Sequence, residues 1–154
     1  MKSLTGVALI AVSQAGKQNF PEFDKQHSHC QMDYKFKNAS CDDVYQNILD
    51  ELDLWNTGVG PQTKSLNTYH MHEKSQSDYI WIHHDNPIQY MGFGEIFEFT
   101  QNKKDCEVVA KSRATGYSFN DWYQDYCNLW TVLRGVGASG RLHHSECLQV
   151  PLHP

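Results

Sequence analysis

The chain has 154 residues, 40% of them hydrophobic and 20% charged, a composition that is typical of one folded domain and excludes a largely disordered chain. Its formal net charge is −5, from 13 basic and 18 acidic side chains, and the basic residues form no cluster. Nucleic acids and anionic membranes attract clustered positive charge, so neither is an expected partner. We expect a small molecule, a glycan or a protein as the partner instead.

The first fifteen residues are predicted to be a signal peptide. Lys2 supplies a positive start, the run from Leu4 to Val12 is almost wholly apolar, and small residues precede a cleavage site after Ala15. The run of about nine residues is too short to span a bilayer, which takes about 20. A buried N-terminal strand is the alternative. With Asn38, which begins a glycosylation sequon, the leader predicts a secreted glycoprotein.

Residues 16–137 are predicted to form a single α+β domain. Apolar and polar residues alternate over 30–37, which indicates a half-buried strand. Ser40 then begins an amphipathic helix over 41–55, because its hydroxyl can accept from the free N–H groups of the first turn. Four further strands are expected, at 66–72, 78–84, 88–100 and 106–114.

A second helix is expected after Ser118, because Asp121 stands three residues further on and repeats the pattern at Ser40. This helix would place six apolar side chains on one broad face, toward the core: Phe119, Trp122, Tyr123, Tyr126, Trp130 and Leu133. The tail over 138–154 shows no periodicity and is expected to be loosely ordered. The fold is therefore predicted as an antiparallel sheet of about four to five strands with two helices on one face.

The five cysteines favour an oxidising compartment. Cys30, Cys41, Cys106 and Cys127 are the predicted disulfide partners, and their pairing stays open. Cys147 is expected to be the odd thiol, because the tail around it lacks a pattern. The alternative is an intracellular domain with five free thiols.

Nine histidines occur mostly in clusters. His70 and His72 stand two residues apart on an expected strand, so their rings share one face. His83 or Asp85 on the neighbouring strand would complete a site for zinc or copper. No zinc-finger or HExxH spacing is present, however. We therefore favour histidines that make ordinary hydrogen bonds, with no cofactor; a metal-binding protein, as a metal-dependent hydrolase, is the alternative.

No catalytic signature occurs in the sequence. It contains no nucleophile elbow and no glycine-rich phosphate loop, and Glu95 and Glu98 lie on opposite faces of their strand. No catalytic residue is predicted, and a non-enzymatic binding or structural domain is the favoured interpretation. Tyr79 and Trp81, on the sheet face away from the helices, are the aromatic candidates for ligand binding.

Five short segments stand out within about a third of the chain: Asp78-Tyr79-Ile80, Phe97-Glu98-Phe99, Cys106-Glu107-Val108, Ser112-Arg113-Ala114-Thr115-Gly116-Tyr117-Ser118 and Tyr126-Cys127-Asn128. Together they resemble small secreted eukaryotic proteins of no known function. The Ser-Arg-x-x-Gly-x-Ser portion is also similar to an uncharacterised family of bacterial and plastid proteins, often lipoproteins. That family has an aspartate where this chain has Phe119. The likeness implies an exported α+β domain and no particular activity.

Arg113 is the residue that the resemblance singles out. Beside Ser112 and Ser118, an arginine at a strand end would hold a carboxylate or a phosphate of a ligand. The alternative is a structural ion pair with Asp121 or Glu107.

Overall fold

The computed structural model describes residues 19–57, 68–86, 91–139 and 142–151. The predicted signal peptide lies outside these residues. Within these ranges, two helices and six strands follow one another: β1 (His29–Phe36), α1 (Cys41–Asn56), β2 (Thr68–Ser75), β3 (Tyr79–Asn86), β4 (Met91–Asn102), β5 (Asp105–Ala114), α2 (Gln124–Gly135) and β6 (His143–His144). None of the described helices is both long enough and apolar enough to span a membrane.

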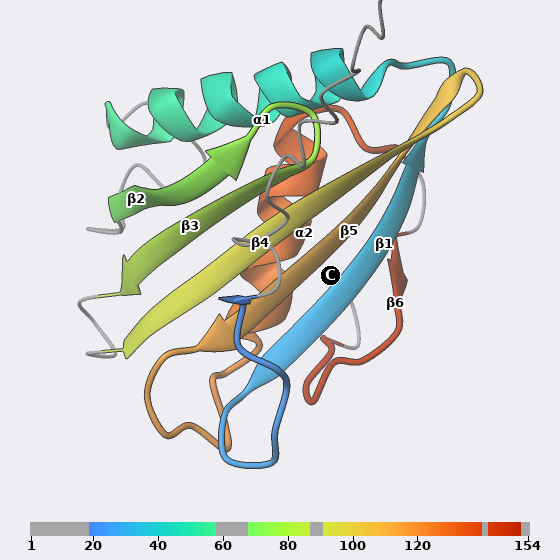
Figure 1. The fold of residues 1–154 in the computed structure, drawn as a ribbon. Helices are drawn as coiled ribbons and strands as arrows, with labels where there is room; N and C mark the ends of the chain where they lie inside the picture. The colour runs from blue at the N-terminus through green and yellow to red at the C-terminus, as the bar shows by residue number, and fades with distance from the viewer. Residues whose placement is uncertain (1–18, 58–67, 87–90, 140–141, 152–154) are drawn as a thin grey trace, which may run out of the picture.

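The six strands form one antiparallel sheet in the order β2-β3-β4-β5-β1-β6 (Figure 1). The predicted α+β class with an antiparallel sheet is confirmed. The sheet has one strand more than expected, because His143 and His144 of the tail pair with Asp33 and Met32 of β1. A two-residue strand carries too few side chains for its alternation to be visible in the sequence.

Helix α1 forms as its sequence predicts. The Ser40 hydroxyl accepts a hydrogen bond from the backbone N–H of Asp43 at 3.1 Å, and two acidic residues lie in the first turn, at the positive end of the helix dipole. The buried side chains recur at helical spacing and turn one stripe of the helix toward the sheet: Val44, Tyr45, Ile48, Leu52 and Trp55.

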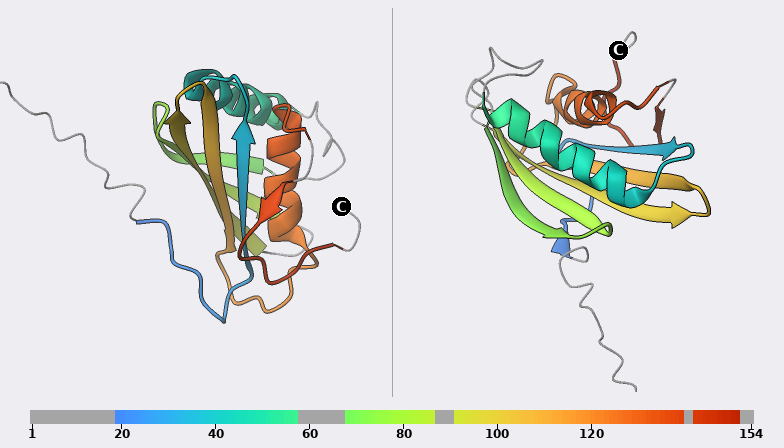
Figure 2. Two further views of the ribbon diagram at one scale, coloured as in Figure 1. Left: turned by 90° about the vertical axis from the view of Figure 1, so that its right-hand side faces the viewer. Right: turned by 90° about the horizontal axis from the view of Figure 1, so that it is seen from above.

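Both helices lie on the same side of the sheet. Residues 19–28, here called the N-terminal segment, lie on the opposite side (Figure 2). The main core lies between the helices and the inner sheet face, where every second residue of β5 is buried, as the alternation over 106–114 predicts. A second, smaller cluster on the outer face consists of Tyr79, Trp81 and Ile96, with Phe20 of the N-terminal segment packed against it.

Helix α2 begins later than the sequence indicates. Its first residue is Gln124, and the residues before it form an irregular loop. Trp122 and Tyr123 have φ values of 55° and 67°, and this left-handed backbone cannot be part of an α-helix. The prediction that Phe119, Trp122 and Tyr123 face the core is therefore wrong; all three are exposed.

Two disulfides join the sheet to its surroundings. Cys41 at the start of α1 pairs with Cys106 of β5, and Cys30 of β1 pairs with Cys147 of the tail. The prediction of Cys147 as the odd thiol is wrong, because the tail runs beside β1 and brings that residue to the strand. The free cysteine is Cys127, on the exposed side of α2.

The bridged tail is accordingly not loose coil throughout. Its backbone forms hydrogen bonds with β1, from Ser145 N–H to Gln31 O and from Leu148 N–H to His29 O, each at 3.1 Å. Two disulfides in a domain of this size fit an extracellular protein. Asn38 is exposed in the turn between β1 and α1, which is compatible with a glycan; its glycosylation and the secretion of the chain stay predictions.

Candidate functional site

The most unusual surface of the molecule is the connection between β5 and α2. Within its residues 117–123, here called the aromatic loop, four aromatic side chains are exposed: Tyr117 (75%), Phe119 (73%), Trp122 (71%) and Tyr123 (43%). Aromatic side chains are normally the most buried part of a domain, since each buries a large apolar area. Exposed together on one short loop, they form an apolar surface.

Side-chain oxygens accept hydrogen bonds from the backbone N–H groups of the aromatic loop. The side chain of Asn120 accepts from the Trp122 N–H at 3.0 Å, while the side chains of Asp121 and Gln149 accept from the Tyr123 N–H at 3.1 and 3.2 Å. A left-handed conformation costs an ordinary residue about 1–2 kcal/mol. These hydrogen bonds offset that cost at two successive residues, whose aromatic side chains are exposed.

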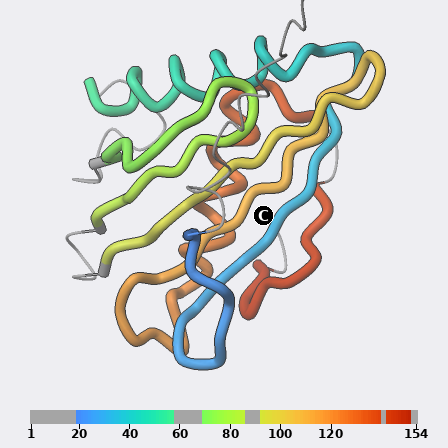
Figure 3. Tube along the Cα trace, in the orientation of Figure 1, coloured from blue at the N-terminus to red at the C-terminus, as the bar shows by residue number. Residues whose placement is uncertain are grey.

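The start of the loop is joined to the N-terminal segment, and the two run side by side at one end of the sheet (Figure 3). The Ser118 N–H donates to Gln26 O at 3.1 Å, and His27 pairs with Ser118 in a short parallel bridge. The Tyr117 ring stacks on the His27 ring with 5.4 Å between their centroids. The aromatic loop is thus fixed at its start as well as at its end.

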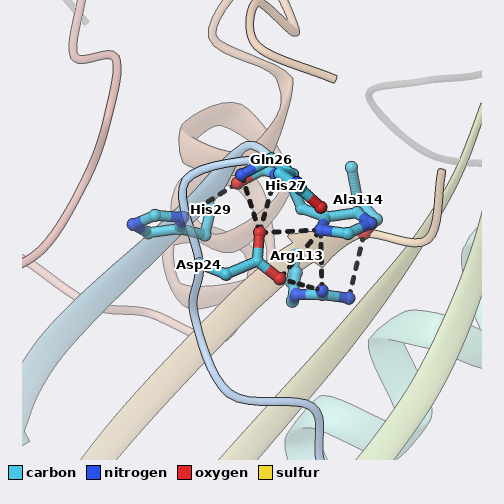
Figure 4. Close-up of polar contacts among 6 residues, drawn as sticks. All are labelled: Asp24, Gln26, His27, His29, Arg113 and Ala114. Carbon is cyan, nitrogen blue, oxygen red and sulfur yellow. Dashed lines mark hydrogen bonds and ion pairs between the residues drawn. The ribbon is translucent and has the colours of Figure 1, made fainter. Parts of the chain in front are cut away.

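Arg113 anchors the N-terminal segment to the sheet, as Figure 4 shows. Its guanidinium donates to the Asp24 carboxylate at 2.7 Å, and one of its nitrogens lies 2.8 Å from Nδ1 of His27. Asp24 also accepts from the backbone N–H groups of Gln26 and His27, at 2.7 and 3.0 Å. Hydrogen bonds from His27 and Arg113 hold the pKa of Asp24 well below its usual range.

An ion pair within the chain is the predicted alternative to a ligand site at Arg113, and the structure contains such a pair. The guanidinium is engaged by an internal carboxylate, and that carboxylate is Asp24, not Asp121 or Glu107. Ser112 points to the other side of the sheet, where it is fully buried and donates to Asp125 at 2.6 Å. Adjacent residues of a strand face opposite ways, so Ser112 and Arg113 do not meet in one ligand site.

Replacing Asp24 by asparagine is expected to loosen residues 19–28, because the neutral amide loses the ion pair with Arg113. Faster hydrogen exchange or proteolysis of this segment in Asp24→Asn measures the effect, and Asp53→Asn, at an exposed site of α1, is the control. Since the Asp24 pKa is lowered on folding, the contribution is present above the ordinary carboxyl pKa and is lost as pH falls. A segment equally protected in both variants contradicts this role.

The other predicted ligand residues, Tyr79 and Trp81, are not available on the surface. They are 2% and 7% exposed, and the Phe20 ring covers Trp81 at a centroid distance of 5.6 Å. The Tyr79 hydroxyl donates to Glu73 at 2.6 Å, and this hydrogen bond, together with burial, raises the pKa of Tyr79 to about 12. The sheet face that the sequence leaves open is partly closed by the chain's own N-terminal segment.

The histidines of the predicted metal site come near one another on β2 and β3. The His72 and His83 rings meet edge to face at 4.7 Å, and the His70 Nε2 atom lies 3.4 Å from the Asp85 carboxylate. Burial and the nearby His72 lower the pKa of His83. Even so, no three metal-binding side chains within the described ranges are arranged to hold one ion. The geometry gives two separate pairs of side chains.

A buried polar network lies between the inner sheet face and α2. Glu95 of β4 accepts from the Asn128 amide at 2.8 Å and lies 3.5 Å from Nδ1 of His84. The Tyr69 ring stacks on His84 with 4.4 Å between centroids. Glu95 and Asn128 are each 1% exposed and His84 is fully buried, so no substrate reaches this network in the folded state. Its evident role is to position α2 on the sheet.

No protein-family model and no curated protein sequence matches the chain. The resemblances drawn from residues 78–128 stay predictions. A proposal of function therefore depends on the geometry alone.

The aromatic loop is the surface that sequence reasoning missed. Its residues lie at nearly helical spacing, and that periodicity predicted a core-facing helix. A contrary signal is present in Gly116 and in the Asn120-Asp121 pair, which are typical turn residues. These turn residues indicate that the segment before Gln124 is a loop that carries exposed aromatic side chains.

Proposed function

We propose that the protein is a secreted, non-enzymatic binding domain that recognises a protein partner through the aromatic loop. One observation carries the proposal: three side chains of the loop are each more than 70% exposed, and the left-handed backbone at Trp122 and Tyr123 is hydrogen-bonded in place. Tryptophan and tyrosine are enriched among the residues that contribute most to protein–protein binding. A loop that is already ordered loses little entropy when it binds.

The shape of the loop favours a macromolecule over a small ligand. Small molecules bind in concave sites that enclose most of their surface, whereas the aromatic side chains of this loop protrude. A protein with a recess of its own can enclose them instead. The loop's one ionisable acid, Asp121, is buried, so the contact surface is uncharged and gives anionic membranes nothing to attract.

Removal of two protruding rings tests the proposal. Binding is measured to intact cells and to the proteins that those cells secrete. We expect Phe119→Ala/Trp122→Ala to weaken this binding by at least about tenfold, since central aromatic residues contribute about 2 kcal/mol or more each. Leu54→Ala is the matched control, because Leu54 is an apolar side chain 44% exposed on α1, outside the loop. Circular dichroism checks that each variant is folded.

Three outcomes contradict the proposal. Binding that survives the double substitution places the contact elsewhere on the domain. Binding that is abolished by enzymatic removal of glycans from the partner identifies a glycan ligand instead of a protein. Binding to protein-free lipid vesicles that depends on Phe119 and Trp122 identifies a membrane-contacting loop.

A further inference from the structure

Two acidic side chains are buried directly beneath the aromatic loop. Asp121 belongs to the loop and Asp125 to the first turn of α2, and each is 2% exposed. The Asp121 carboxylate accepts from the backbone N–H groups of Tyr123 (3.1 Å) and Asp125 (2.7 Å). The Asp125 carboxyl accepts from the Ser112 hydroxyl at 2.6 Å. The pair thus connects the loop to the helix and to the sheet.

Among the described residues, no cation neutralises the pair. No ion pair in the part of the chain that the structure describes involves Asp121 or Asp125. The side chains that face the pair, or lie one contact beyond it, are neutral or acidic: Ser28, Ser112, Cys127 and Glu95. Burial and the nearby Asp121 carboxylate both disfavour a charge on Asp125, and its Oδ2 atom is buried without a hydrogen-bond partner among the described residues.

The surroundings decide which carboxyl group is neutral. Burial and the adjoining Asp121 raise the pKa of Asp125 well above its ordinary value, and the hydroxyls of Ser112 and Ser28 offset this only in part. Two N–H groups and the positive end of the α2 dipole surround the Asp121 carboxylate. That same helix end disfavours a metal cation as the neutralising group.

We propose that Asp121 and Asp125 share one proton, and that loss of this proton to water at higher pH releases the aromatic loop. With the proton in place, Asp121 holds the Tyr123 N–H and the left-handed turn persists. When Asp125 also ionises, repulsion moves the Asp121 carboxylate away from its donors. The strained turn then loses the Asp121 bond at Tyr123 and keeps only the acceptors Asn120 and Gln149. An effect on partner binding rests on the proposed function; the protonation itself does not.

The direction of the pH dependence follows from the raised pKa of Asp125. An acid whose pKa is higher in the folded state stabilises the fold below its unfolded pKa, and this stabilisation is lost as pH rises through the folded value. We therefore expect the unfolding temperature and the order of the loop to decrease as pH is raised. Asp125→Asn, which stays neutral at every pH, is expected to abolish this decrease.

Hydrogen exchange at the Tyr123 amide, from about pH 5 to about pH 8, measures the effect in the whole chain. After correction for intrinsic exchange, protection in the wild type is expected to fall by about tenfold for each unit of pH between the ordinary carboxyl pKa and the raised pKa of Asp125. In Asp125→Asn it is expected to stay constant, while Asp53→Asn on α1 keeps the wild-type profile. Matching profiles in the wild type and Asp125→Asn overturn the proposal.

A second measurement needs no variant. The ¹³C chemical shift of the Asp125 carboxyl reports its protonation directly, and a midpoint at the ordinary carboxyl pKa of 3.8 would overturn the proposal even if Asp125→Asn does not fold. A midpoint well above that value supports it. Neither measurement uses a binding partner. The protonation proposal can therefore hold even if Phe119→Ala/Trp122→Ala leaves binding intact and the proposed function fails. It can also fail even if binding depends on the aromatic loop.

Discussion

Replacing Cys41 and Cys106 by alanine is expected to lower the free energy of unfolding by about 2–5 kcal/mol. The disulfide between them joins the first residue of α1 to β5 across a sequence separation of 65 residues. Its loss frees a long loop in the unfolded chain and so raises the entropy of that state. Equilibrium unfolding in urea, under non-reducing conditions, measures the change.

Cys127→Ala is the matched control, because Cys127 is the one described cysteine without a disulfide partner. It is expected to leave the unfolding midpoint nearly unchanged. Peptide mapping of the oxidised protein checks the pairing independently, and a peptide that links Cys147 to Cys127 would falsify the assignment of Cys30–Cys147. Equal stability of the oxidised and fully reduced wild type would contradict a structural role for both disulfides.

The elements that the sequence predicts well are those whose local pattern agrees with their final surroundings. The alternation over 30–37 and the stripe from Val44 to Trp55 each match one buried face, so β1 and α1 lie where they are expected. The antiparallel α+β class follows from such local patterns. The sixth strand does not, because His143 and His144 become a strand only through pairing with β1.

The cysteine pairing shows the same limit. No local pattern distinguishes Cys147 from Cys127, and what separates them is tertiary: the tail lies beside β1, and Cys127 faces outward from α2. The ligand candidates Tyr79 and Trp81 were expected on an open sheet face. The irregular N-terminal segment covers them through Phe20, and no periodic pattern in the sequence predicts this contact.

The aromatic loop differs in kind from these cases, because there the local pattern misleads. Its spacing is helical, yet Trp122 and Tyr123 adopt a left-handed backbone that the Asp121 side chain stabilises. Local preference and final conformation conflict most often at functional sites, where strain is offset by surrounding contacts. The error in the sequence prediction therefore coincides with the surface that we propose for binding.

Replacing Asn128 by alanine is expected to destabilise the fold by about 2–4 kcal/mol, because it leaves a buried carboxyl group without its donor. The Asn128 amide donates to Glu95 at 2.8 Å, and both side chains are 1% exposed, so water cannot take over the hydrogen bond. Thermal and urea unfolding measure the loss. Asn47→Ala, at an exposed position of α1, is the control and is expected to have little effect.

A double substitution separates the lost hydrogen bond from lost packing. When both partners of a buried polar pair become apolar, no group is left unsatisfied, and the cost falls toward zero. Glu95→Leu/Asn128→Leu is therefore expected to be more stable than Asn128→Ala. If the double variant is the less stable of the two, the contacts of Glu95 with His84 and its surroundings contribute more than the bond to Asn128. In that case the buried polar network holds α2 on the sheet through β3 and β4 together, and not through a single hydrogen bond.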